Sequence, residues 1–271
     1  MTQPAQTLAA TLVRGGHVRS ADGTTIRYLA RGSGPVIVGI HGGLGTALSL
    51  MPLAEHLADE FEVVLLNCRG HGTSESGRSE PHIDRYVEDI LAVIDAVGPI
   101  QALFGYSFGA VLALETALAA GDLVPRLLVY EPPLPVTYPM PDLTWLESTL
   151  AEGRYEELIL QALSQGGGGL STAELAAARD NPFWLSNVAH APTLLPTMRV
   201  LSVLSPTIQQ YGEVSVPTKL ILGTASAPFL HQAGDLLASV LPDITVERHD
   251  GQGHHFDPAL LARAVAGFVG R

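Results

Sequence analysis

The fold of this chain is decided by one stretch, residues 100–120, which reads IQALFGYSFGAVLALETALAA. The apolar run Ile100–Phe104 predicts a buried strand, and the segment after Gly109 predicts a helix. Between them, Gly105 and Gly109 lie two positions either side of Ser107, where the absence of a β-carbon lets the strand and helix backbones pass closely. Such a turn lifts a serine hydroxyl clear of the chain and next to a helix N-terminus, which favours negative charge. The stretch therefore presents Ser107 as a candidate nucleophile.

Strands and helices alternate on both sides of this turn. Five short apolar runs predict strands covered on both faces, and helical spacing separates most of them. The predicted strands are Val36–Ile40, Glu62–Leu66, Ile100–Phe104, Leu127–Tyr130 and Thr218–Gly223, followed by Ile244–His249; the predicted helices are Leu48–Leu57, Ile83–Val97, Phe229–Leu241 and Pro258–Val269. Two further strands, His17–Ser20 and Thr25–Arg31, precede them, after a loose tail over residues 1–10. This order predicts an α/β fold, a mostly parallel, doubly wound sheet with helices on both faces.

The pattern changes between Pro132 and Ser215, where helices are predicted and no strand is. The helical stretches are Leu143–Leu150, Tyr155–Leu163, Thr172–Arg179 and Trp184–Val203. An insertion after the sixth strand would lie over the carboxyl ends of the strands, where such sheets bind ligands. We therefore predict a core of residues 1–131 and 216–271 and a helical cap of residues 132–215. The four glycines 166–169 fit a hinge or a loose loop, and five large side chains fit either the pocket or the packing of the cap: Tyr138, Trp145, Phe183, Trp184 and Leu185.

Composition excludes several classes of protein. Among 271 residues the net charge is −12 and Lys219 is the only lysine, so neither a nucleic-acid partner nor a P-loop is expected. The single cysteine, Cys68, allows no intrachain disulfide and no structural zinc site. No secretory signal and no apolar run of spanning length is apparent, so a cytoplasmic protein without membrane contact is expected. No metal-ligand cluster or dinucleotide glycine pattern occurs, and no cofactor is expected.

Four motifs together resemble the α/β-hydrolase superfamily, over residues 16–271. They are His41-Gly42-Gly43, Arg69-Gly70-His71-Gly72-Thr73-Ser74, Gly105-Tyr106-Ser107-Phe108-Gly109 and Gly251-Gln252-Gly253-His254. The resemblance implies the α/β-hydrolase type of sheet, with Ser107 as the nucleophile and His254, in a glycine-rich loop after the last strand, as the base. His255 is a second candidate for the base. The serine at position 107 sets the chain apart from haloalkane dehalogenases and epoxide hydrolases of the superfamily, which carry aspartate at this position.

Acyl transfer to a serine also needs donors for the developing oxyanion. The backbone N–H of Phe108 lies at the helix start directly after Ser107, and the resemblance assigns the second backbone donor to Gly43. The resemblance also implies that His41 orders its own loop by hydrogen bonding. His71, His82 and His190 are interpreted as solvated or structural.

The acid of the triad departs from the superfamily pattern. Ala225 stands after the strand Thr218–Gly223 where the carboxylate is usual, and Asp235 falls inside the next helix. Glu131 ends the preceding strand, from which some members supply the acid instead. Two roles for Glu131 are consistent with the sequence: it orients His254, or it only anchors the cap beside Pro132 and Pro133.

Three functions are consistent with the sequence. The first is a serine hydrolase acting on a small, largely apolar ester, lactone, thioester or related carbonyl compound. The second is a non-hydrolytic lyase, cyclase or dehydratase of the same fold, favoured by the missing acid at Ala225. The third is a ligand-binding sensor on the same scaffold. The sequence identifies neither the substrate nor the oligomeric state.

Overall fold

The computed structural model describes residues 12–78, 80–165, 173, 177, 179–180 and 184–270. The predicted tail over residues 1–10, the glycines 166–169, Phe183 and most of the predicted helix Thr172–Arg179 lie outside these residues.

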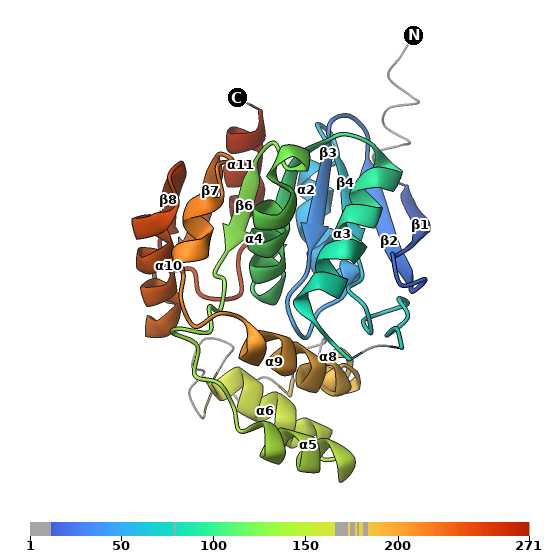
Figure 1. Ribbon diagram of the computed structural model, residues 1–271, viewed down its shortest axis with the longest axis vertical. Coiled ribbons are helices and arrows are strands. Elements are labelled where there is room, and N and C mark those ends of the chain that lie inside the picture. The colour runs from blue at the N-terminus through green and yellow to red at the C-terminus, as the bar shows by residue number, and fades with distance from the viewer. Residues whose placement is uncertain are drawn as a thin grey trace.

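One eight-stranded sheet forms the centre of the molecule (Figure 1). Its strands are β1 (Val13–Arg19), β2 (Thr25–Gly32), β3 (Val36–Ile40), β4 (Glu62–Leu66), β5 (Ile100–Tyr106), β6 (Leu127–Tyr130), β7 (Thr218–Gly223) and β8 (Ile244–His249). Their order is β1-β2-β4-β3-β5-β6-β7-β8. β1 and β2 are antiparallel, and every pairing from β4 to β8 is parallel. The predicted fold class is confirmed.

Helices cover both faces of this sheet because its central strands are buried on both sides. One face packs against α3 (Ile83–Val97), α4 (Phe108–Ala120) and α10 (Pro228–Val240), and the other against α2 (Met51–Leu57) and α11 (Pro258–Val269). α4 is apolar all round and almost wholly buried, which fixes the position of its first residue. The start of α4 is thus held rigidly at the carboxyl end of β5.

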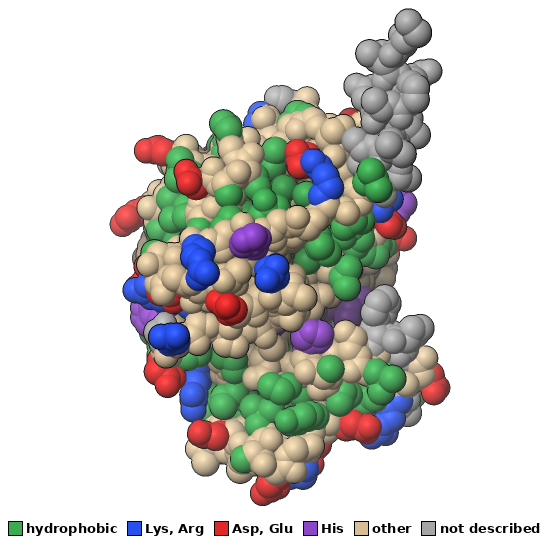
Figure 2. Space-filling view, turned by 90° about the vertical axis from the view of Figure 1, so that its right-hand side faces the viewer, with side chains coloured by type: hydrophobic (Ala, Val, Ile, Leu, Met, Phe, Trp, Pro, Cys, Tyr) green, Lys and Arg blue, Asp and Glu red, His purple; other side chains and the backbone are tan. Residues whose placement is uncertain are grey.

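Between β6 and β7 the described chain forms only helices, which lie together beyond one end of the sheet (Figure 1). They are α5 (Leu143–Ala151), α6 (Tyr155–Gln165), α8 (Trp184–Ala189), the 3-10 helix η3 (Ala191–Thr193), α9 (Leu194–Val203) and the 3-10 helix η4 (Gln209–Glu213). α5, α6, α8 and the start of α9 share a small hydrophobic cluster of their own, which includes Leu146, Ile159, Trp184 and Leu194. Figure 2 shows these helices as a lobe below the sheet, with hydrophobic side chains on its surface.

Two of the predicted helices are each divided into shorter helices in the structure. The predicted helix Trp184–Val203 is divided into α8, η3 and α9, because Pro192 has no N–H to continue the ladder. The predicted helix Leu48–Leu57 is divided into the 3-10 helix η1 (Ala47–Leu50) and α2, which has Pro52 in its first turn. β1 also begins at Val13, earlier than the predicted His17, because its pairing with β2 runs from Val13 to Arg19.

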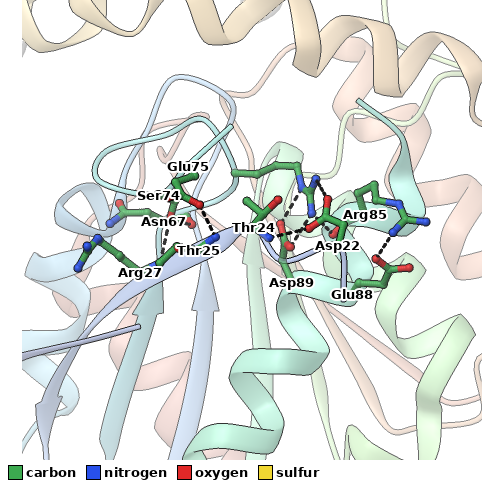
Figure 3. A network of polar contacts seen from close by, with 11 residues as sticks. Asp22, Thr24, Thr25, Arg27, Asn67, Ser74, Glu75, Arg85, Glu88 and Asp89 are labelled. Atoms are coloured by element: carbon green, nitrogen blue, oxygen red, sulfur yellow. Dashed lines mark hydrogen bonds and ion pairs between the residues drawn. The ribbon is translucent and has the colours of Figure 1, made fainter. Parts of the chain in front are cut away.

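The residues of the Arg69–Ser74 motif make contacts that stabilise the fold. The buried Arg69 guanidinium donates to both carboxylate oxygens of Asp89 on α3, at 2.8 and 2.7 Å, and to Asp22 in the β1–β2 turn at 3.1 Å. Figure 3 shows Asp22 and Asp89 within this network, and Ser74 and Glu75 bonded to the backbone of β2. These contacts fix the loop after β4 to the edge of the sheet.

Candidate active site

Ser107, His254 and Glu131 form one chain of hydrogen bonds. His254 Nε2 lies 3.0 Å from Ser107 Oγ, and His254 Nδ1 lies 2.7 Å from Glu131 Oε2. The three residues come from the β5–α4 turn, the loop after β8 and the end of β6. With the carboxylate on Nδ1, that nitrogen carries the ring proton, and Nε2 is left as an acceptor facing the serine hydroxyl. His254 Nε2 can therefore accept the proton of the Ser107 hydroxyl.

Glu131 is held in place by more than the histidine. Its side chain is fully buried, and its Oε1 accepts hydrogen bonds from the backbone N–H of Gly223, at 2.7 Å, and from the hydroxyl of Ser226. The loop that carries Ala225, where an acid is usual, thus binds the carboxylate of Glu131 through the residues Gly223 and Ser226. Asp235 points away to solvent and pairs with Arg248.

Backbone strain is concentrated on two of these three residues. Among the described non-glycine residues, only Ser107 and Glu131 have positive φ, 55° and 49°. Such conformations cost about 1–3 kcal/mol each and persist only where the surroundings impose them. At Ser107 the backbone N–H donates to Tyr130 O, and at Glu131 the N–H donates to Ile221 O. The sheet therefore imposes both conformations, and both side chains face His254 as a result.

Two tyrosines hold the loop that carries His254. The hydroxyl of Tyr106 donates to the carbonyl of His254 at 3.0 Å, and that of Tyr130 donates to the carbonyl of Gly253 at 2.6 Å. The ring of Tyr106 also packs against the imidazole, with 5.2 Å between centroids. These contacts fix the position of the imidazole relative to Ser107.

The loop after β3 lies directly against Ser107. A β-carbon added to Gly42 would lie 3.2 Å from Ser107 Cβ, and one added to Gly43 would lie 3.8 Å from Phe108 Cβ. Gly43 and Phe108, the two candidate oxyanion donors, are therefore close neighbours next to Ser107.

The other histidines have structural contacts. His41 Nε2 accepts from the backbone N–H of Cys68, and His41 Nδ1 donates to Gly42 O, which confirms that its ring orders its loop. Burial lowers the pKa of His41 well below its ordinary value and that of His71 to about 4, so both rings are neutral at pH 7. His82 caps α3, and His190 Nδ1 donates to Ser186 O. His255 is exposed, 6.4 Å from the ring of His254, which leaves His254 as the ring bonded to Ser107.

A comparison with protein families agrees with this architecture. The model of the alpha/beta hydrolase family matches residues 37–266. The chain belongs to the alpha/beta hydrolase family. The match extends from β3 to α11, so it includes the turn at Ser107, Glu131 and the loop of His254.

Similar hydrolases are found among solved structures and known sequences. An alpha/beta hydrolase from Sphaerobacter thermophilus is 33% identical, with a TM-score of 0.84 over 93% of this chain and 99% of that one. The 2-(acetamidomethylene)succinate hydrolase of Mesorhizobium japonicum is 23% identical over 90% of this chain and 91% of that protein. The uncharacterized hydrolase YraK of Bacillus subtilis is 36% identical, but the match covers only 41% of this chain and 42% of YraK. These comparisons support an enzyme of the alpha/beta hydrolase type.

The tight turn at Ser107 leads to a testable expectation for Gly105. A β-carbon there would collide with the carbonyl oxygen of Gly109 and lie 2.6 Å from Ala110 Cα, and both contacts are with backbone. Gly105→Ala should therefore destabilise the fold by about 3 kcal/mol or more and lower Tm by roughly 6–12 °C. Thermal unfolding followed by circular dichroism measures the change.

Gly267→Ala is the matched control. Gly267 lies within α11, and an added β-carbon would meet no atom within 4 Å. Alanine favours a helix over glycine, so this variant should keep or slightly raise Tm. A Gly105→Ala protein that melts like the wild type would show that β5 and α4 are not packed as closely as described.

Several residues that contact the site are not predicted from the sequence. Ser226, Tyr106 and Tyr130 contact Glu131 or the His254 loop only because the loops after β7 and β8 fold over the end of β6. Tyr106 and Tyr130 stand directly before Ser107 and Glu131, and that adjacency is the one feature that could have pointed to them.

The described residues contain no group of three or more His, Cys, Asp or Glu side chains placed to hold a metal ion. Nor does any helix in the described ranges have the length and hydrophobicity to cross a bilayer.

Proposed function

We propose that the protein is a serine hydrolase that acts on a small, uncharged, largely apolar ester, lactone or thioester. The observation that carries this proposal is the continuous hydrogen-bond chain from Ser107 through His254 to Glu131. A serine hydroxyl is a weak nucleophile until a base takes its proton, and this chain supplies the base and the group that orients it.

In the proposed reaction, Ser107 Oγ attacks the carbonyl carbon while His254 Nε2 takes the hydroxyl proton. The carbonyl electron pair moves to oxygen, and the backbone N–H groups of Gly43 and Phe108 stabilise the negative charge. The tetrahedral species expels the alcohol or thiol, which receives the proton from His254, and an acyl-enzyme remains. Water, deprotonated by His254, then attacks the acyl carbon, the bond from that carbon to Ser107 Oγ breaks, and His254 returns the proton to Oγ as the acid is released. Glu131 stabilises the imidazolium at each stage without taking the proton.

We assign the helical segment, residues 132–215, to the cap over this site, with residues 1–131 and 216–271 as the core. A small cavity of about 20 Å³ lies within this segment, next to α9 and between α5 and α6. Tyr138, Trp145, Leu194 and Met198 contribute to its walls, whereas Trp184 is buried in the cap cluster and Leu185 is 78% exposed. The cavity has room for about one water molecule, so its apolar walls, and not its volume, are the reason to expect an apolar substrate.

The walls of this cavity also favour an uncharged substrate. Among the described residues that line it, none is charged, and the most polar is Gln161. The nearest cation along α9, Arg199, pairs with Glu147 and Glu80 instead. A carboxylate packed against these walls would lose its hydration without gaining a partner, which is costly. The succinate named for the Mesorhizobium japonicum relative is acidic, so the preferred substrate here should differ from it in charge.

The substrate class is tested with paired model esters of similar length. We expect kcat/KM for 4-nitrophenyl butyrate to exceed that for mono-4-nitrophenyl succinate by about 100-fold, equivalent to about 3 kcal/mol for a buried, unpaired charge. Release of 4-nitrophenol is followed at pH 7.5, with the uncatalysed rate of each ester subtracted. Equal values for the two esters, or a preference for the succinate, would contradict the assignment of an uncharged substrate.

The serine mechanism is tested separately with a fluorophosphonate, which phosphorylates activated serines irrespective of substrate. The wild type should be labelled at Ser107, as shown by mass spectrometry of the modified peptide. A wild-type protein that is never labelled would refute the mechanism and favour the non-hydrolytic or sensor alternatives.

A further inference from the structure

The hydroxyl of Thr197, on α9, is buried without a hydrogen-bond partner. Thr197 is 1% exposed, and its Oγ1 has no partner among the residues the structure describes. A buried, unpaired hydroxyl costs about 1–3 kcal/mol, so its presence in a native protein calls for a reason.

Local structure does not supply that reason. A threonine inside a helix commonly donates to the carbonyl four residues before it, as Thr116 does to Leu112 O at 2.8 Å. Thr193, one turn before Thr197, donates to His190 O at 2.7 Å and lies 3.1 Å from Gly43 O. Thr197 makes neither kind of bond. Valine has the same shape and would fill the same space without an unpaired group, so packing alone does not require threonine here.

The position of the side chain gives the reason. A β-carbon added to Gly43 would lie 3.2 Å from Thr197 Cγ2, 3.8 Å from Thr197 Oγ1 and 3.8 Å from Phe108 Cβ. Thr197 therefore packs against Gly43, whose N–H is one candidate oxyanion donor and whose neighbour Phe108 supplies the other. The contact from Thr193 to Gly43 O holds α9 against the same loop.

We propose that Thr197 is a third donor of the oxyanion hole, supplied by the cap. The inference rests on the proposed function and deepens it. When Ser107 Oγ bonds to the carbonyl carbon, the carbonyl electron pair moves to oxygen and the Thr197 hydroxyl donates a hydrogen bond to that oxygen, without giving up its proton. The cap then takes part in transition-state stabilisation as well as covering the substrate.

The test uses two pairs of side chains that differ by one hydroxyl: Thr197 against Thr197→Val, and Thr197→Ser against Thr197→Ala. The measured quantities are the second-order rate of fluorophosphonate labelling, which also passes through a charged oxygen, and kcat and KM for 4-nitrophenyl butyrate. Within each pair, loss of the hydroxyl should lower the labelling rate and kcat by about 100-fold, as for other single oxyanion donors. KM should change little, because the bond strengthens only in the transition state.

Thr116→Val is the control for replacing a buried helical threonine away from Gly43. It should keep the wild-type labelling rate, whatever its effect on Tm. If Thr197→Val fails to fold, the Ser and Ala variants decide the question alone. Equal labelling rates within the pairs, in a protein whose wild type is labelled, would overturn the role of Thr197 and leave the serine mechanism intact. A wild type that resists the probe would overturn the serine mechanism and, with it, this role.

Discussion

Replacement of Ser107 by alanine is expected to lower kcat for a neutral ester by about five to six orders of magnitude, the loss seen when a serine protease loses its nucleophile. The variant has no oxygen to attack the carbonyl or to receive a proton from His254, whose Nε2 lies 3.0 Å from Oγ. Labelling by the fluorophosphonate should disappear completely. Only the residual effect of the oxyanion donors and of substrate binding should remain.

The fold should survive this change. Ser107 is half-buried, and its backbone N–H, which alanine keeps, makes the bond to Tyr130 O. Alanine tolerates a positive φ no better than serine, so Tm should stay within a few degrees of the wild type. Ser239→Ala, on the outer part of α10, removes an exposed hydroxyl that bonds only Leu236 O and should keep full activity. If Ser107→Ala retained a hundredth of the wild-type kcat, Ser107 could not be the nucleophile.

The second large effect is expected for Glu131→Gln, which should lower kcat by roughly 10⁴-fold. The Gly223 N–H and the Ser226 hydroxyl both donate to Oε1, so the amide oxygen of glutamine must take that position. The amide NH₂ then faces His254 Nδ1, which has to become an acceptor. The ring proton moves to Nε2, and the imidazole can no longer accept the proton of Ser107.

This effect is chemical rather than structural, and the controls separate the two. Glu115→Gln alters a half-buried glutamate on α4, whose Oε1 accepts from the Tyr211 hydroxyl, and should leave kcat unchanged. Glu131→Asp keeps the charge but shortens the reach, so it should retain more activity than Glu131→Gln. Activity within tenfold of the wild type in Glu131→Gln would mean that Glu131 only anchors the cap, the alternative that the sequence leaves open.

The sequence by itself was sufficient to predict most of the strands and helices and the turn at Ser107. Buried strands, the turn at Ser107 and the helix that follows it depend on patterns of a few residues, and β3, β4, α3, β6 and β8 have the bounds predicted for them. The elements whose predicted bounds are wrong differ from the structure for local reasons as well. Pro192 ends a helix that apolar spacing alone would have continued, because spacing does not register the loss of one backbone donor.

The groups around Ser107 depend on long-range pairing, which no short pattern encodes. Glu131 reaches His254, 123 residues further along the chain, because β6 and β7 pair in parallel with Tyr130 opposite Ile221. That register places Glu131 beside Gly223 and Ser226, at the position where an acid after β7 would otherwise be expected. Thr197 meets Gly43 only when α9 folds back over the sheet. The sequence by itself identified Ser107 and His254 as the candidate nucleophile and base. The tertiary structure alone decided which carboxylate and which hydroxyl lie beside them, because those contacts depend on strand register and on the docking of the helical segment.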